Sequence, residues 1–92
     1  MNETILTARI MAALRARGIY VVKYHGSAFS TAGVPDLLCC ADGKLIAMEI
    51  KVQFRQPTPI QEVQIAKIRA AGGVAVVVRS VEEALAACMP DP

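Results

Sequence analysis

The 92-residue chain contains no tryptophan and only four aromatic residues, two tyrosines and two phenylalanines, so its core must be built mainly from aliphatic side chains. This scarcity of aromatic residues argues against recognition of single-stranded nucleic acid by base stacking. No apolar run reaches the roughly 18 residues that a membrane-spanning helix requires. Because the composition is nevertheless 54% hydrophobic and 20% charged, it predicts one small folded domain rather than a disordered segment.

Cysteine is also scarce, with Cys39, Cys40 and Cys88 as the three examples. An odd number without a recognisable signal peptide indicates a reducing cytoplasm, which we expect to be that of a bacterial or phage-infected cell. Neighbouring strand residues point to opposite faces, so Cys39 and Cys40 do not form a natural chelating pair. We interpret all three as small apolar residues rather than zinc ligands.

A strong excess of either charge is absent, since the formal net charge is +2. This value is too small to identify a nucleic-acid partner, although it permits a local basic face that neutralises phosphates. The alternative is a set of dispersed, solvated charges. The candidates for phosphate contact are Lys23, His25, Ser27, Lys51, Arg55 and Lys67.

Apolar periodicity and capping signals predict an α/β fold with the element order αβββαβα. The first three strands are expected to form an antiparallel meander, and the fourth to pair in parallel with the third through a right-handed helical crossover. The sheet is therefore mixed, four-stranded and flanked by helices. The expected helices are 3–17, a second from Pro59 that Gly72-Gly73 ends, and 81–88, which Pro90 terminates. The expected strands are 19–25, 34–41, 44–52 and 74–79.

A predicted hairpin carries the most informative pattern in the chain. Asp42-Gly43 suits a two-residue type I′ turn, which requires positive φ at both central positions. That turn places Asp36 directly opposite Glu49, and Lys51 follows on the same face two residues later. A one-residue shift would instead oppose Asp36 to Met48 or Ile50, which belong to the apolar face, so alternation favours the first register.

Opposed carboxylates repel each other, and their oxygen atoms are the ligands that Mg²⁺ and Mn²⁺ prefer. The hairpin therefore predicts a site for a divalent cation. The alternative that the hairpin alone leaves open is a solvent-facing sheet with scattered charges and no metal.

Four ordered segments extend this pattern over nearly the whole chain: Gly33-Val34-Pro35-Asp36-Leu37-Leu38, Glu49-Ile50-Lys51, Thr58-Pro59-Ile60-Gln61 and Ala71-Gly72-Gly73 before a valine-rich strand. Together they resemble the PD-(D/E)xK nuclease superfamily and, more narrowly, its virus-type replication–repair nuclease (VRR-NUC) family. Lys23-Tyr24-His25-Gly26-Ser27 is similar to the corresponding stretch of stand-alone members. The resemblance implies a restriction-endonuclease-like αβββαβ core across residues 1–92 and magnesium-dependent hydrolysis of phosphodiester bonds.

The resemblance also implies roles for individual residues. Asp36 and Glu49 would bind the metal, with the Ile50 carbonyl as a third ligand, and Lys51 would orient the attacking water and offset charge on the phosphorane. Gln61 and Glu3 match further site positions. Each has an alternative: Gln61 could serve only as a capping-box residue with Gln64 in its place, and Glu3 could simply favour a helix N-terminus. His25 could be structural, and Lys51 an ordinary surface lysine.

We therefore expect a Mg²⁺- or Mn²⁺-dependent DNA endonuclease that recognises DNA structure rather than sequence, as junction-resolving (Holliday junction) enzymes do. Paired cuts in a four-way junction imply a symmetric homodimer. The apolar faces of helices 3–17 and 81–88 are the expected contact. The alternative functions are a catalytically silent DNA-binding module and a small α/β interaction protein.

Overall fold

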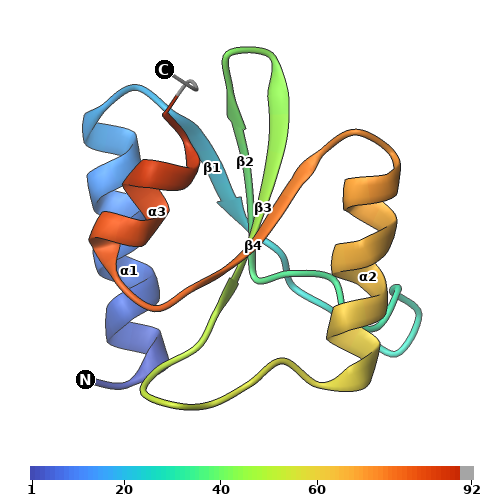
Figure 1. Ribbon diagram of the computed structural model, residues 1–92. Coiled ribbons are helices and arrows are strands. Elements are labelled where there is room, and N and C mark those ends of the chain that lie inside the picture. The colour runs from blue at the N-terminus through green and yellow to red at the C-terminus, as the bar shows by residue number, and fades with distance from the viewer. Residues whose placement is uncertain (90–92) are drawn as a thin grey trace.

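The computed structural model describes residues 1–89 as a four-stranded sheet with three helices (Figure 1). The observed order is αβββαβα, as the sequence predicts. The helices are α1 (Glu3–Ala16), α2 (Pro59–Ala70) and α3 (Val81–Ala87), and the strands are β1 (Tyr20–Lys23), β2 (Leu37–Ala41), β3 (Lys44–Ile50) and β4 (Val74–Val78). The expected helix stop at Pro90 lies outside the described residues. Within residues 1–89, no helix combines the length and apolar character needed to cross a bilayer.

The strand order in the sheet is β1-β2-β3-β4. The two pairings within β1, β2 and β3 are antiparallel, whereas β3 and β4 are parallel and connected through α2. The hairpin turn is the predicted one, because Ala41 pairs with Lys44 and the φ values of Asp42 and Gly43 are 52° and 74°. The predicted register and the parallel pairing of β3 with β4 through a helix are therefore confirmed.

All four strands are shorter than expected, and β1 and β2 differ most, by three residues each. The expected strand 34–41 begins only at Leu37. Pro35 has no backbone N–H for a strand ladder, and the Asp36 side chain accepts a hydrogen bond from the Ile50 N–H at 2.8 Å. At this end of β3, the Ile50 N–H therefore donates to the Asp36 side chain, in place of the backbone carbonyl that a longer β2 would have supplied.

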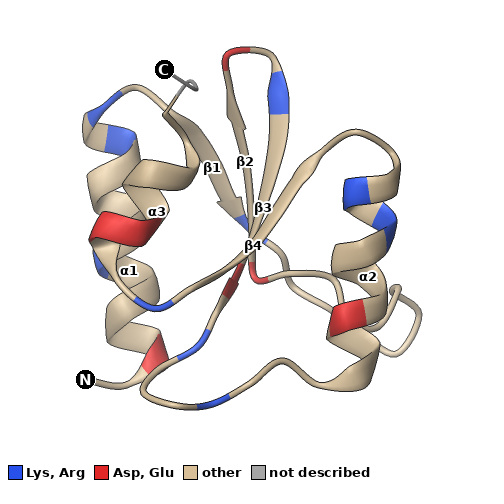
Figure 2. Cartoon of the chain, in the orientation of Figure 1, with Lys and Arg blue, Asp and Glu red and all other residues tan. Residues whose placement is uncertain are grey.

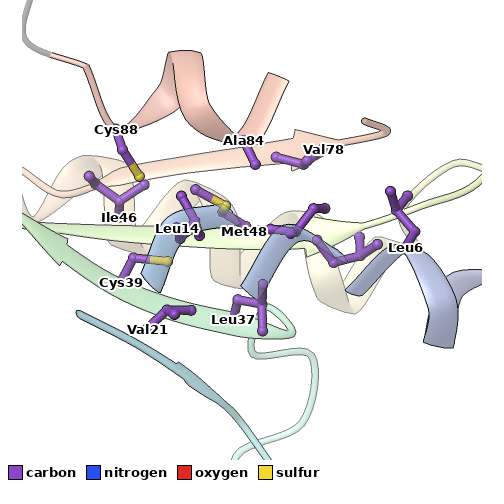
Figure 3. Close-up of a cluster of buried hydrophobic side chains, with 12 residues drawn as sticks. Leu6, Leu14, Val21, Leu37, Cys39, Ile46, Met48, Val78, Ala84 and Cys88 are labelled. Atoms are coloured by element: carbon purple, nitrogen blue, oxygen red, sulfur yellow. The ribbon is translucent and has the colours of Figure 1, made fainter. Parts of the chain in front are cut away.

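The two faces of the sheet are covered differently. Helices α1 and α3 pack together over one face, and α2 covers the other on the β4 side (Figure 1). The larger core lies under α1 and α3 and contains most of the buried aliphatic side chains, shown in Figure 3: Leu6, Ile10, Leu14, Val21, Leu37, Cys39, Ile46, Met48, Ile50, Val78, Ala84 and Cys88. The smaller core, under α2, consists of Ala47, Ile65 and Ala75.

This arrangement overturns the expected dimer contact. The apolar faces of α1 and α3 do not face solvent, because they cover the sheet and each other. Amphipathic periodicity predicts that a helix face is apolar, but it does not predict whether the sheet of the same chain or a second copy buries that face.

Two of the three cysteines pack as the apolar interpretation made from the sequence predicts. Cys39 and Cys88 are buried on the same side of the sheet (Figure 3), and Cys40 is exposed. Burial raises the pKa of the Cys39 thiol to about 12 and also raises the pKa of Cys88. Both thiols are therefore protonated, and they pack as small apolar side chains.

Candidate active site

Asp36 and Glu49 lie side by side on the α2 face of the sheet. Leu37 pairs with Met48, so Asp36 falls opposite Glu49 at the next position of the antiparallel register. The Asp36 side chain also accepts from the backbone of Ile50, the neighbour of Glu49. The backbone of Asp36 is held from the other side, because its carbonyl accepts from the Tyr24 N–H at 2.8 Å. The two carboxyl groups predicted to face each other do so.

Glu49 is the most unusual residue of this pair, because its side chain is only 2% exposed. Within residues 1–89, its Oε1 atom is buried and has no hydrogen-bond partner. Desolvation, followed by the hydrogen bond and the charge of Asp36, raises the pKa of Glu49 to about 8, against the opposing effect of Lys51. A buried carboxyl oxygen without a hydrogen-bond partner is unfavourable, so Glu49 destabilises the folded state of the metal-free protein.

Lys51 supplies the positive charge of the site. Its Nζ lies 4.0 Å from Glu49 Oε2, and its side chain is only 13% exposed. Its backbone N–H donates to the Val78 carbonyl at 3.1 Å, which continues the parallel ladder beyond β3. This held backbone and the limited exposure do not fit an ordinary surface lysine.

The Ile50 carbonyl is directed to the same region. The N–H and C=O of a strand residue point to the same side of the strand, and the Ile50 N–H points to Asp36. Two carboxylates, one backbone carbonyl and one ammonium group therefore converge at this end of β2 and β3.

Gly33 brings two of the sequence segments into contact. It has a φ of +80°, and a Cβ atom added there would lie 2.6 Å from the Ile60 carbonyl oxygen. The loop that delivers Asp36 is therefore packed directly against the first turn of α2, at a position that only glycine can occupy without rearrangement.

The two glutamines and Glu3 have different positions around this centre. Gln61 forms the capping box, since its Oε1 accepts from the Thr58 N–H at 2.9 Å and Thr58 caps the helix in return. Within residues 1–89, no hydrogen bond connects Gln61 or the half-buried Gln64 to Asp36 or Glu49. Glu3 is close enough for its charge to raise the pKa of Glu49 and lies 3.7 Å from Arg55.

Most of the expected phosphate-contacting residues belong to the end of the sheet that carries the carboxylates, but not all share their face. Lys23, the last residue of β1, pairs with Leu37, so its side chain lies on the α1 and α3 face and not on the Asp36–Glu49 face. His25 and Ser27 are on the following loop, and Arg55 is on the loop after β3. Lys67 is the exception, because it lines a hollow beside Gly43 at the opposite end of the sheet. Helix α2 starts beside the Gly33 loop, and its basic C-terminal half lies toward the hairpin turn (Figure 2).

Arg79 is a residue that the sequence analysis missed. Its guanidinium donates to the Gln53 carbonyl at 2.9 Å, and its backbone N–H donates to Glu83 at 2.8 Å. It therefore fixes the turn directly after Lys51 by a contact between residues 26 positions apart in the chain. No local sequence signal could have predicted that contact.

Comparison with known proteins identifies the family. Residues 8–86 match the model described as archaeal Holliday junction resolvase (Hjc). The chain belongs to the Hjc family. No curated protein sequence matches it significantly.

Solved structures place this Hjc family member among the VRR-NUC folds. A structure titled "VRR_NUC domain" is 26% identical over 91% of this chain and 90% of its own, with a TM-score of 0.76. A "VRR_NUC domain protein" is 20% identical over 94% and 84% of the two chains, with a TM-score of 0.74. The Hjc of Archaeoglobus fulgidus, titled a Holliday junction resolvase from an archaeal hyperthermophile, is 18% identical over 84% and 67%, with a TM-score of 0.66. The latter two show the fold alone, and together the matches confirm the VRR-NUC, PD-(D/E)xK-type nuclease fold.

The donor set of this Hjc family member fits a hard divalent cation. Within residues 1–89, no group of three or more Cys, His, Asp or Glu side chains is suitable for a metal. The Asp36–Glu49 pair, the Ile50 carbonyl and water are oxygen donors of the kind that Mg²⁺ and Mn²⁺ accept, and Glu49 Oε1 still lacks a partner. The composition of the pair excludes a zinc site built from cysteine and histidine.

Proposed function

We propose that this protein is a Mg²⁺- or Mn²⁺-dependent DNA endonuclease that cuts branched DNA, with four-way junctions as its preferred substrate. The observation that carries the proposal is the buried Glu49 carboxyl with an unpartnered oxygen beside Asp36. A cation bound beside such a carboxyl group stabilises its charged form, which burial otherwise makes unfavourable. Membership of the Hjc family supports a junction as the substrate.

Asp36, Glu49 and the Ile50 carbonyl would hold the cation. The cation would polarise the scissile phosphate and make water a better nucleophile at neutral pH. Lys51, beside Glu49, is suited to donate to a non-bridging phosphate oxygen or to the attacking water, and its charge would offset the negative charge that develops on phosphorus. Glu3 and one of Gln61 or Gln64 would act at the edge of the site.

The DNA would be recognised by its shape and its phosphates. The residues that would contact phosphates on either side of the cut come from the segments that lead into Asp36 and away from Lys51: Lys23, His25, Ser27 and Arg55. Phosphate contacts position a protein on DNA without reading its sequence. Selectivity for branched DNA would then depend on which DNA shapes can reach Asp36 and these residues together.

Two symmetric cuts would require a homodimer. Because α1 and α3 use their apolar faces in the core, the contact would use other surface. Strand β1 is an edge strand on which Tyr20 and Val22 are exposed, and it is the better candidate. Light scattering at micromolar concentration should give twice the chain mass of 9.8 kDa, and efficient paired cutting by a monomer would refute this part of the proposal.

The activity is tested with labelled four-way junction, flap, splayed and linear DNAs of matched sequence. Wild-type protein should cut the junction in the presence of Mg²⁺ and leave it intact in excess chelator. Calorimetric titration with Mg²⁺ should show binding to wild type and no binding to Glu49→Gln. Absence of cleavage on every substrate, together with absence of Mg²⁺ binding, would refute the proposed function.

A further inference from the structure

Both phenylalanines of the chain are almost completely exposed, Phe29 at 101% and Phe54 at 94%. The other exposed large apolar side chains retain between 37% and 64% of their surface. A phenylalanine is normally among the most buried residues, and this protein has no other. Full exposure of both is therefore a feature that the fold itself does not explain.

Each phenylalanine occupies the third position of a hydrogen-bonded turn. In the first turn the Ser30 N–H donates to the Ser27 carbonyl at 3.0 Å, and the Phe29 N–H donates to Ser27 Oγ at 3.3 Å. The Ser27 and Ser30 hydroxyls also lie 3.0 Å apart. These bonds define the backbone of the turn, so Phe29 is presented at its apex.

The second turn has the same construction. The Arg55 N–H donates to the Val52 carbonyl at 3.2 Å, and Gln53 has a φ of 52°. Arg79 holds the Gln53 carbonyl, as described above. Phe54 follows Gln53 at the apex, and the turn that carries it is tied to the end of β4.

Both turns belong to loops that adjoin the Asp36–Glu49 site. The loop with Phe29 runs from β1 into Asp36 and is anchored by the Tyr24 hydroxyl, which donates to the Thr31 carbonyl at 3.2 Å, and by Gly33. The loop with Phe54 leaves Lys51 and leads to α2. Figure 1 shows the two loops at the same end of the sheet, one extending past α2 and the other crossing below α1.

We propose that Phe29 and Phe54 stack on bases exposed at the branch point of the DNA, which rests on the proposed function. The interior of a linear duplex exposes no base face, whereas opening of a branch point exposes the faces of the base pairs that flank it. Stacking there therefore requires less unstacking than stacking within a duplex. Phe stacks on any base because every base has a π face, and Arg55 beside Phe54 supplies a phosphate contact. The small number of aromatic residues argues against base stacking when composition alone is considered. The full exposure of Phe29 and Phe54 makes stacking possible at these two positions.

A second copy of the chain is a poorer occupant for these side chains. The two phenylalanines are on different loops, and their neighbours along the chain are small or polar: Ala28, Ser30, Gln53 and Arg55. Stable protein contacts have a desolvated apolar centre, which two separate side chains on different loops do not provide.

Tryptophan fluorescence gives a direct test, because the chain has no native tryptophan. Phe29→Trp and Phe54→Trp are each made in a Glu49→Gln background, which prevents cleavage during titration. Leu45→Trp is the matched control, since Leu45 is exposed four residues along β3 from Glu49, beside the hairpin turn. Saturating four-way junction should quench both phenylalanine-site probes several-fold more than saturating linear duplex does, and should leave the control unchanged. Equal quenching by both DNAs, or none, would overturn the proposal.

A binding measurement complements the fluorescence. Phe29→Ala and Phe54→Ala should each lower the ratio of junction to linear-duplex affinity by about ten-fold, because one stacked base is lost. The corresponding Trp variants should retain the ratio, and unfolding transitions should be unchanged because the side chains are exposed. If the Ala variants instead shift the protein from dimer to monomer with an unchanged affinity ratio, the phenylalanines contact a second copy and the proposal is wrong. If the junction quenches both probes but the wild-type protein cuts no DNA, the proposed nuclease activity is wrong and the stacking inference stands. If the wild-type protein cuts the junction but the Ala variants keep the ratio of junction to linear-duplex affinity, the stacking inference is wrong and the nuclease activity stands.

Discussion

The two faces of β3 are buried to a similar extent and are chemically opposite. Toward α1 and α3 the strand presents Ile46, Met48 and Ile50, all within the larger core. Toward α2 it presents Ala47 and then Glu49, which is as buried as its apolar neighbours. Burial is favourable on the first face and unfavourable for Glu49 on the second, since a carboxyl loses its hydration there. The apolar face of β3 therefore holds the strand in place, while the other face carries a buried carboxyl group, Glu49, that is unfavourable by itself.

The largest expected effect concerns the polar face. Asp36→Asn, Glu49→Gln and Lys51→Ala should each reduce the cleavage rate by about 1,000-fold or more, because each removes several kcal/mol of transition-state stabilisation. Their unfolding transitions should remain cooperative, since no core cavity opens. Glu62→Gln, an equivalent change on the exposed surface of α2, is the control and should cut at the wild-type rate. Full activity of Lys51→Ala with Mg²⁺ present would exclude its assigned role.

The next largest effect concerns the apolar face. Met48→Ala should lower the free energy of unfolding by about 2–5 kcal/mol, because it leaves a cavity in the larger core. Leu45→Ala, at a half-exposed position of the same strand, should cost much less. Urea denaturation measures both. A Met48→Ala protein as stable as wild type would mean that the two faces do not differ in the way described.

Stability should also depend on pH through Glu49. In the unfolded chain this carboxyl loses its proton near its ordinary pKa of 4.5, whereas the folded protein keeps the proton up to a pKa of about 8. The folded state therefore binds more protons between these values, and the metal-free protein should become less stable as pH rises from about 5 to 8. The slope from this group is about 1.4 kcal/mol per pH unit at most. Urea midpoints across this range should fall in wild type and change much less in Glu49→Gln.

The smallest expected effect is on the salt dependence of DNA binding, which should differ between substitutions at the two ends of the sheet. Log affinity for DNA should fall linearly with log salt concentration, with a slope of about −0.9 for each phosphate neutralised. Lys23→Ala and Arg55→Ala, at the end of the sheet that carries the carboxylates, should each reduce that slope by about 0.9. Lys67→Ala, near the hairpin turn, should leave it unchanged. Equal effects of all three substitutions would mean that DNA contacts the whole length of the sheet.

The helices, the strands and their order could be predicted from local patterns of residues. Asp42-Gly43 sets the turn, the turn sets the register, and the register places Asp36 opposite Glu49. Asn2, Thr58 and Ser80 cap the three helices from adjacent positions. These features could be predicted because each depends on residues a few positions apart or on the strict alternation of a strand.

Which surfaces are covered could not be predicted in the same way, because it depends on tertiary packing. The burial of Glu49, the packing of the apolar faces of α1 and α3, and the position of Lys67 all depend on how distant segments meet. The same is true of Phe29 and Phe54, which a pattern of hydrophobic residues would assign to a core. Composition states how much apolar and charged surface a chain has, but packing between segments remote in sequence decides which part of it meets solvent, DNA or a cation.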